Sequence, residues 1–190
     1  MSDETYSSLA AIEDWIGASL IRAAVDKRAA FRWPVLSTIA DGALPSSRVV
    51  VMRRYDPKNR KITIYTDGRS AKVDQIRSNE NVALLFFDQR RSIQLRVNGV
   101  AKIHKDDDVR KQALSALPLT RQSDYATEAA PGSVQQSSET AYLSENASEN
   151  FCVITVKANT ADWLWLNRDG HRRALFEWKE GQTERFWVTP

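Results

Sequence analysis

The spacing of hydrophobic and polar residues changes once along the chain, near residue 30. Residues 7–28, SSLAAIEDWIGASLIRAAVDKR, place apolar side chains three and four positions apart, with acidic and basic side chains between them. This spacing predicts one amphipathic helix. Beyond it, apolar residues follow the period of two that is typical of strands, in segments bounded by turn-forming residues. The chain therefore begins with a helix and continues as a mainly β protein.

The clearest strand pattern is SIQLRVNGVAKIH, in which Ile93, Leu95 and Val97 alternate with polar residues. The other predicted strands are 31–40, 47–55, 62–66, 81–87, 151–166, 172–178 and 184–188, and the predicted helices are 70–78, 106–117 and about 139–149. The connection 118–138 has no regular period, and a connection of this length is more often functional than idle. We predict a single domain, residues 1–190, folded as a β-barrel with peripheral helices.

Composition narrows the class of protein further. The chain is 42% hydrophobic and 27% charged, and its net charge of +3 is not gathered into Lys/Arg blocks, so we expect no nucleic-acid partner. No apolar run approaches the roughly 20 residues of a membrane span, and the acidic start does not resemble a signal peptide. The single cysteine, Cys152, lies in an apolar run and is predicted to be buried. We expect a cytoplasmic protein without a metal site.

One short stretch, IYTDGRSAK, carries the residue types that bind an anion. Thr66 and Ser70 supply hydroxyl groups, Arg69 and Lys72 supply positive charge, and Gly68 permits a tight turn. A helix that begins near Ser70 would direct free backbone N–H groups to the same place. Locally, two interpretations stay open: an anion site, or an ordinary turn in which Ser70 only caps the helix.

Four further motifs appear in a fixed order around this stretch. They are RVVVMRRYD from Arg48, NENVALLFF followed by Gln94, Gln136-Ser137-Ser138 in the long connection, and Trp163 ten residues before Arg173. Together with Tyr65, Thr66, Ser70 and Lys72, they resemble the pyridoxamine 5′-phosphate oxidase family of flavin mononucleotide (FMN) split-barrel proteins. The resemblance extends over residues 31–178.

The resemblance implies a six-stranded antiparallel Greek-key split barrel that forms a homodimer with FMN at the subunit interface. The positions that match the family's cofactor contacts are Arg48, Val49, Val50, Val51, Met52, Arg53, Tyr65, Thr66, Ser70, Lys72, Gln94, Gln136, Ser137, Trp163 and Arg173. Arg48, Ser70 and Lys72 would bind the phosphate, and Trp163 and Arg173 would come from the partner subunit. Arg48 and Arg53 fall on opposite faces of a regular strand, so either a bulge intervenes or only one reaches the phosphate, and we favour Arg48.

The sequence departs from the family pattern at two places. The family has an arginine where this chain has Ala71, and Arg69 is the candidate to replace it. The family's substrate-binding Arg-x-His is Asp169-Gly170-His171 here, which leaves His171 as a candidate substrate contact. An aspartate at that position would repel a phosphorylated substrate. Arg121, Ser123 and Tyr125 have suitable side chains for such a phosphate, but their spacing does not match.

The family resemblance therefore implies an FMN-dependent oxidoreductase that transfers a hydride from an unidentified small molecule to flavin N5. Oxygen or another acceptor would reoxidise the flavin. Three alternatives remain: pyridoxamine 5′-phosphate oxidase itself, a flavin-binding or electron-carrying module with no dedicated substrate, and a split barrel that has lost FMN.

Overall fold

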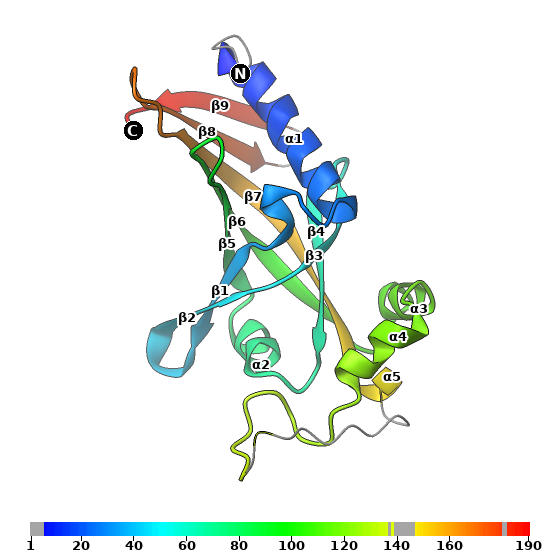
Figure 1. Cartoon of the computed structure of the whole chain (residues 1–190). Helices are drawn as coiled ribbons and strands as arrows, with labels where there is room; N and C mark the ends of the chain where they lie inside the picture. The colour runs from blue at the N-terminus through cyan, green and yellow to red at the C-terminus, as the bar shows by residue number, and fades with distance from the viewer. Residues whose placement is uncertain (1–5, 137, 139–146, 180–181) are drawn as a thin grey trace.

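The computed structural model describes residues 6–136, 138, 147–179 and 182–190 and forms one antiparallel sheet with helices around it (Figure 1). The strands are β1 (Val35–Ala40), β2 (Leu44–Val49), β3 (Met52–Asp56), β4 (Lys61–Asp67), β5 (Asn81–Asp88), β6 (Ile93–His104), β7 (Phe151–Trp165), β8 (Arg172–Lys179) and β9 (Gln182–Val188). The helices are α1 (Leu9–Val25), α2 (Ala71–Ser78), α3 (Asp108–Ser115), α4 (Leu119–Gln122) and α5 (Ala147–Asn150).

The sheet runs in the order β2-β1-β5-β6-β7-β4-β3, and β8 and β9 extend it from β7. β7 is long enough to pair with β4 along its first half and with β8 along its second half. A bulge between Asn98 and Gly99 bends the β6–β7 ladder. Gly99 is required there, because a Cβ atom at this position would lie 2.2 Å from the carbonyl oxygen of Lys157.

Helix α1 is the predicted N-terminal helix, with its ends set by two side chains. The Ser8 hydroxyl accepts a hydrogen bond from the Ala11 N–H at 3.1 Å and caps the first turn. The buried Arg32 guanidinium donates to the Ala23 and Ala24 carbonyl groups at 2.9 and 2.6 Å, near the last turn. The apolar stripe of α1 packs on β3, and Figure 1 shows the helix crossing the end of the sheet that carries β8 and β9.

Two predicted strands have different boundaries in the structure. The segment 31–40 contains a 3-10 turn, Ala30–Arg32, and becomes a strand only at Val35. The segment 47–55 is two strands, β2 and β3, at the two ends of the main strand path. The chain passes between them at Val50 and Val51, and the Val50 N–H donates to the Pro34 carbonyl at 2.9 Å. Because the ladder does not join β2 to β3, the sheet is not closed, and its described part has nine strands rather than six.

The other elements agree with the predicted fold class. A mainly antiparallel sheet with peripheral helices is confirmed, and the buried side chains of the sheet and α1 form one principal core. The predicted helix at about 139–149 lies mostly outside the described residues, which include only its end as α5. In the described part of the chain, no helix has the length and apolar character needed to cross a bilayer.

The buried polar residues near α3 serve the fold. Cys152 is fully buried, as predicted. His104 is also buried, and its ring nitrogens lie 2.6 Å from Asp107 Oδ2 and 2.9 Å from Thr155 Oγ1. Asp107 caps α3 by accepting the Arg110 N–H at 3.1 Å. His104 thus fixes the start of α3 against β7.

Candidate functional site

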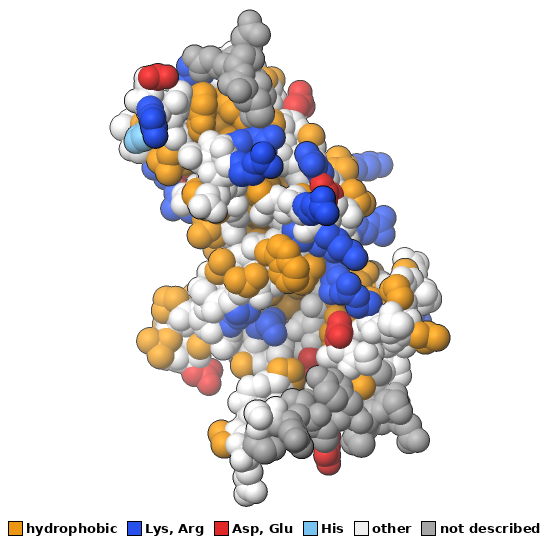
Figure 2. Space-filling view, viewed as in Figure 1, with side chains coloured by type: hydrophobic (Ala, Val, Ile, Leu, Met, Phe, Trp, Pro, Cys, Tyr) orange, Lys and Arg blue, Asp and Glu red, His pale blue; other side chains and the backbone are white. Residues whose placement is uncertain are grey.

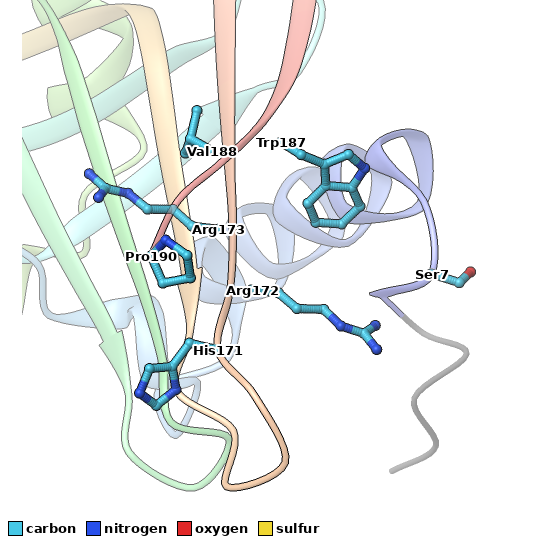
Figure 3. Close-up of a pocket in the computed structure, with 7 residues that line it drawn as sticks. All are labelled: Ser7, His171, Arg172, Arg173, Trp187, Val188 and Pro190. Carbon is cyan, nitrogen blue, oxygen red and sulfur yellow. The ribbon is translucent and has the colours of Figure 1, made fainter.

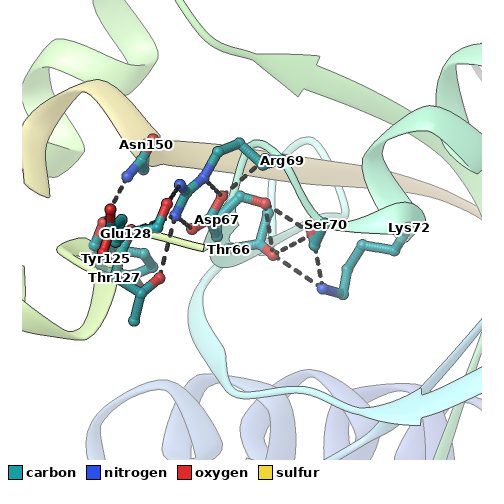
Figure 4. A network of polar contacts seen from close by, with 9 residues as sticks. All are labelled: Thr66, Asp67, Arg69, Ser70, Lys72, Tyr125, Thr127, Glu128 and Asn150. Carbon is teal, nitrogen blue, oxygen red and sulfur yellow. Dashed lines mark hydrogen bonds and ion pairs between the residues drawn. The ribbon is translucent and has the colours of Figure 1, made fainter. Parts of the chain in front are cut away.

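The end of β4 and the start of α2 bring two hydroxyl groups and a lysine together (Figure 4). The Thr66 and Ser70 hydroxyl oxygens are 3.2 Å apart, and Lys72 Nζ donates to them at 3.1 and 2.9 Å. Thr66 and Ser70 are buried, and Lys72 is half-buried. The Ser70 hydroxyl donates to the Asp67 carbonyl at 2.7 Å and makes no capping hydrogen bond to α2. Ser70 is thus the N-cap residue of α2, as predicted, but its side chain is directed to Asp67 and Lys72 and not to the backbone of the helix.

Arg48 adds a second positive charge beside this group. Its guanidinium donates to the Thr38 hydroxyl at 2.6 Å, to Gln75 Oε1 at 2.9 Å and to the Ser46 hydroxyl at 2.7 Å. All three acceptors are neutral, and within the described residues neither Arg48 nor Lys72 forms an ion pair with a carboxylate. We call the following set the junction cluster: Arg48, Thr66, Ser70 and Lys72.

The electrostatics of the junction cluster favour a bound anion. Burial, followed by the charge of Arg48, lowers the pKa of Lys72 below its usual value, and burial also lowers the pKa of Arg48. An anion between the two cations would relieve both effects. On the face seen in Figure 2, Lys and Arg side chains form a band from α1 towards α4 with few acidic side chains in it. Such a surface attracts anionic ligands.

Arg69 points away from the junction cluster (Figure 4). Its Nε and Nη2 atoms donate to the two carboxylate oxygens of Asp67 at 3.1 and 2.8 Å. Its guanidinium also donates to the Thr127 and Glu128 carbonyl groups, both at 2.9 Å. The structure therefore contradicts the expectation that Arg69 replaces the arginine missing at Ala71, because Asp67 and the long connection already bind this guanidinium.

The structure separates the two arginines of the RVVVMRRYD motif. Arg48 joins the junction cluster, whereas the Arg53 guanidinium lies over the Tyr65 ring, 5.6 Å from its centroid. The pairing of β3 with β4 shifts by one residue between Met52 and Arg54. Between the two arginines, Val49 is exposed, Val51 is half-buried, and Val50 and Met52 are buried, so this segment offers a ligand mainly backbone and the Val49 side chain.

A second set of predicted contacts lies at the other end of the sheet. Gln94 on β6 lies opposite Leu164 on β7, and Leu164 lies opposite Arg173 on β8. Directly opposed residues share one face of a sheet, so Gln94 and Arg173 face the same way. In Figure 1, β8 lies in the upper half of the molecule and α2 in the lower half, so the strand that carries Arg173 is not beside the helix that begins at the junction cluster.

Trp163 is not with Gln94 and Arg173, which corrects the sequence prediction. It is one residue from Leu164 on β7 and therefore points to the opposite face, where it is fully buried against Tyr6 with ring centroids 5.2 Å apart. The sequence motif places Trp163 ten residues before Arg173. In the structure, Arg173 pairs with Leu164, so Trp163 lies on the opposite face of the sheet from Arg173.

Arg173 is held by an acid that the sequence analysis missed. Its Nε and Nη2 atoms donate to the two carboxylate oxygens of Asp162 at 3.0 and 2.8 Å, and Arg96 donates to the same carboxylate. Burial alone would raise the pKa of Asp162, but the hydrogen bonds from Arg173 and Arg96 lower it below its usual value. The sign of this shift means that the cluster stabilises the fold at neutral pH and loses that contribution under acid conditions.

His171 lies beside Arg173 at the edge of a cavity of about 610 Å³. Figure 3 shows His171 and Arg173 pointing to one side of β8, while Arg172 and Trp187 point to the other side. The His171 side chain is exposed. His171 and Arg173 therefore lie on the same side of β8. This is the arrangement expected if His171 contacts a substrate near the predicted flavin residues.

The remaining predicted residues lie in the long connection. Gln136 is exposed, and Ser137 lies outside the described residues. Tyr125 is buried, packs edge-on against Phe151 at 5.1 Å, and lies near Arg53, whose charge lowers its pKa against the larger raising effect of burial. No sequence motif marked the residues that orient Arg48, because Thr38 and Gln75 are ten and 27 positions away from it.

The fold is an antiparallel sheet with peripheral helices, and the junction cluster gathers cations and hydroxyl groups where β4 meets α2. Residues 13–105 match the family model for the FMN-binding domain of pyridoxamine 5′-phosphate oxidase. A pyridoxine/pyridoxamine 5′-phosphate oxidase of Psychrobacter cryohalolentis is 39% identical over 72 residues, which are 37% of this chain and 32% of that protein. The chain thus spans about a third of that relative's length.

Two longer matches extend the likeness. Pyridoxine/pyridoxamine 5′-phosphate oxidase 2 of Arabidopsis thaliana is 25% identical over 165 residues, covering 81% of this chain and 83% of that protein. The solved structure of a pyridoxamine 5′-phosphate oxidase-related, FMN-binding protein of Nostoc punctiforme is 19% identical. It has a TM-score of 0.72 and covers 100% of this chain and 98% of the other. These findings confirm the resemblance to the pyridoxamine 5′-phosphate oxidase family, with residues 13–105 corresponding to its FMN-binding domain.

The junction cluster has the chemistry that the FMN phosphate needs. It offers two hydroxyl groups and two cations without an acid among them, and it lies at the start of α2, where free backbone N–H groups favour anions. All four of its residues lie within or beside the matched FMN-binding segment. The residues present therefore fit this cofactor.

The position of Arg69 leads to a prediction that separates it from the junction cluster. Arg69→Gln is expected to change FMN affinity by no more than about twofold, because its guanidinium points to the connection. The variant should lower the free energy of unfolding by about 1–2 kcal/mol, since it leaves the buried Asp67 carboxylate without its ion pair. Flavin fluorescence titration and thermal unfolding measure the two effects. A loss of affinity as large as that of a Lys72 variant would contradict this assignment.

Proposed function

We propose that this protein is an FMN-dependent oxidoreductase in which the junction cluster binds the FMN phosphate. The observation that carries the proposal is the pair of partly buried cations, Lys72 and Arg48, whose side chains donate to neutral partners and form no ion pair within the described residues. When bound, FMN supplies a hydride acceptor that can pass electrons on to oxygen or another oxidant. The protein's own part is to fix the phosphate and exclude water from it.

The proposal includes a homodimer with FMN between the subunits. One row of opposed residues crosses seven strands on a single face, and we call it the outer row: Val49, Val35, Leu85, Arg96, Asp162, Leu175 and Phe186. In the next row on the same face, Phe87 on β5 lies opposite Gln94 on β6. Val49, Leu85, Phe87 and Phe186 are 61%, 37%, 50% and 44% exposed, which is unusual for an apolar set on one sheet face.

A second copy of the chain on this face would account for both halves of the site. In one chain, β8 with Arg173 and α2 with the junction cluster lie in opposite halves of the molecule (Figure 1), and a two-fold axis on the outer row would bring one subunit's Arg173 near the other's cofactor. Gln94 shares the row of Arg173 and would act with it. Trp163 has no role in this proposal, because it belongs to the core.

The substrate is expected to be a small molecule without a phosphate group. Asp169 is at the position where the family has a phosphate-binding arginine, and a carboxylate there disfavours a phosphorylated substrate. His171 and Arg173 remain as candidates to orient the substrate from one side of β8. The second candidate function is pyridoxamine 5′-phosphate oxidase itself, favoured by the names of the Psychrobacter and Arabidopsis relatives. An electron-carrying module without a substrate is the third.

The proposed function predicts a yellow protein that pyridoxamine 5′-phosphate does not bleach. The visible spectrum of the purified protein should show the two bands of oxidised flavin, with FMN identified by mass spectrometry. Under anaerobic conditions, pyridoxamine 5′-phosphate should leave these bands unchanged, while dithionite should remove them. Rapid bleaching by pyridoxamine 5′-phosphate would establish the second candidate. A colourless protein that takes up no added FMN would refute all three.

A further inference from the structure

A second cavity, of about 600 Å³, lies between α1 and the β5–β6 turn. This volume is within the range of small-molecule sites. Its lining comes from α1, the Ala30–Arg32 turn, the β5–β6 turn and the end of β7, so it shares no residue with the junction cluster. Trp165 lines it and faces the same side of β7 as Trp163, which is opposite to the face of Gln94 and Arg173. We call this cavity the helix groove.

Aromatic rings form the apolar walls of the helix groove. Trp15 packs edge-on against Tyr6 and Phe31, with ring centroids 5.6 and 5.7 Å apart. Tyr6 in turn packs against Trp165 at 5.1 Å. These contacts fix the rings relative to one another, and the half-buried Trp15 and Trp165 offer aromatic surface to a planar ligand.

The rim of the helix groove carries an excess of positive charge. Four arginines line it, and two of them have acidic partners: Arg91 pairs with Asp88 at 2.8 Å, and Arg22 pairs with Asp26 at 3.1 Å. The other two, Arg28 and Arg90, are exposed and form no ion pair within the described part of the chain. Their guanidinium groups are available to a ligand, and a guanidinium suits a carboxylate because it can donate two parallel hydrogen bonds.

Tyr6 and Arg91 form the inner side of the helix groove. Tyr6 is 2% exposed, and its hydroxyl lies beside Arg91, whose positive charge lowers the pKa of the hydroxyl against the larger raising effect of burial. Arg91 is itself paired with Asp88. These groups therefore serve the fold, and the cations of the groove that are open to a ligand are Arg28 and Arg90.

From these observations we propose that the helix groove binds a small planar aromatic acid at a site separate from the flavin. The ring of the ligand lies against Trp15 and Trp165, and its carboxylate accepts hydrogen bonds from Arg28 and Arg90. This inference does not depend on FMN binding.

Calorimetric titration of the purified protein with 2-naphthoate tests the site. One naphthoate should bind per chain, and the uncharged 2-naphthamide should bind at least about tenfold more weakly, because it cannot form charged hydrogen bonds with arginine. Equal affinities for the acid and the amide would overturn the proposal, as would no binding of naphthoate.

Variants then locate the bound acid. The double variant Arg28→Gln/Arg90→Gln should weaken naphthoate binding at least about tenfold. Lys58→Gln/Lys102→Gln removes two exposed charges elsewhere and should change the affinity by less than about twofold. Arg90→Gln alone, in the exposed β5–β6 turn, repeats the test if the double variant does not fold. Unchanged affinity in the arginine variants, or displacement of flavin by naphthoate, would refute the site.

Discussion

Lys72→Met is expected to weaken FMN binding about ten- to hundredfold. A charged hydrogen bond contributes about 1.5–3 kcal/mol, and methionine keeps the length of the side chain without its charge. The Lys72 ammonium group donates to Thr66 and Ser70 within the junction cluster, so its loss removes the central cation of the proposed phosphate site. Quenching of flavin fluorescence during titration of the apoprotein measures the change.

Stability distinguishes a binding role of Lys72 from a structural one. Without ligand, the ammonium group is partly desolvated and close to Arg48, and both effects lower its pKa. Lys72→Met should therefore leave the melting temperature of the apoprotein unchanged or raise it. Lys58→Met, at an exposed position in the β3–β4 turn, is the matched control and should retain normal FMN affinity. A less stable apoprotein with unaltered FMN affinity would show that Lys72 only supports the fold.

Phe87→Glu is expected to convert a dimer into monomers. The side chain is 50% exposed and lies beside Leu85 of the outer row, so the substitution places a charge on the proposed interface without entering the core. A central aromatic contact contributes at least about 2 kcal/mol, and a two-fold interface contains it twice, so the dissociation constant should rise about a thousandfold. Light scattering coupled to size-exclusion chromatography reports the mass.

The dimer proposal also predicts that FMN binding falls with the dimer. Phe87→Glu should bind FMN more weakly even though its junction cluster is intact, because a monomer lacks the Arg173 that the partner subunit would supply. Leu119→Glu, at an 82% exposed position on α4, is the control and should remain dimeric. A wild-type protein that is monomeric with one firmly bound FMN would exclude the shared site.

The sequence predicted the class of fold because its periods are regular. The 3.6-residue pattern of α1 and the alternation in β6 each bury one face, and the structure places both as expected. The run SRVVVMRRY gave no sign of a break, because its central valines are typical of one continuous strand. In the structure it forms two strands, and the hydrogen bond from the Val50 N–H to the Pro34 carbonyl lies where the chain passes to the other end of the sheet. A local pattern cannot reveal a crossing that depends on distant partners.

The candidate site was predictable in its residue types but not in its side-chain directions. Ser70 and Lys72 lie within one turn of a helix, so their proximity follows from local spacing. Arg69 is adjacent to them, but the Asp67 carboxylate and two carbonyl groups of the long connection direct its side chain elsewhere. Trp163 shows the same limit: a difference of one residue in strand register decides whether a side chain faces the core or a ligand.

The central claim is that this protein recognises FMN through its phosphate, and a comparison with riboflavin tests it most directly. Riboflavin has the same ring and ribityl chain but no phosphate. Titration of the apoprotein with each flavin should show FMN binding at least about a hundredfold more tightly, because in the proposed complex the two cations and two hydroxyl groups of the junction cluster would contact only the phosphate. Equal affinity for FMN and riboflavin would contradict the account.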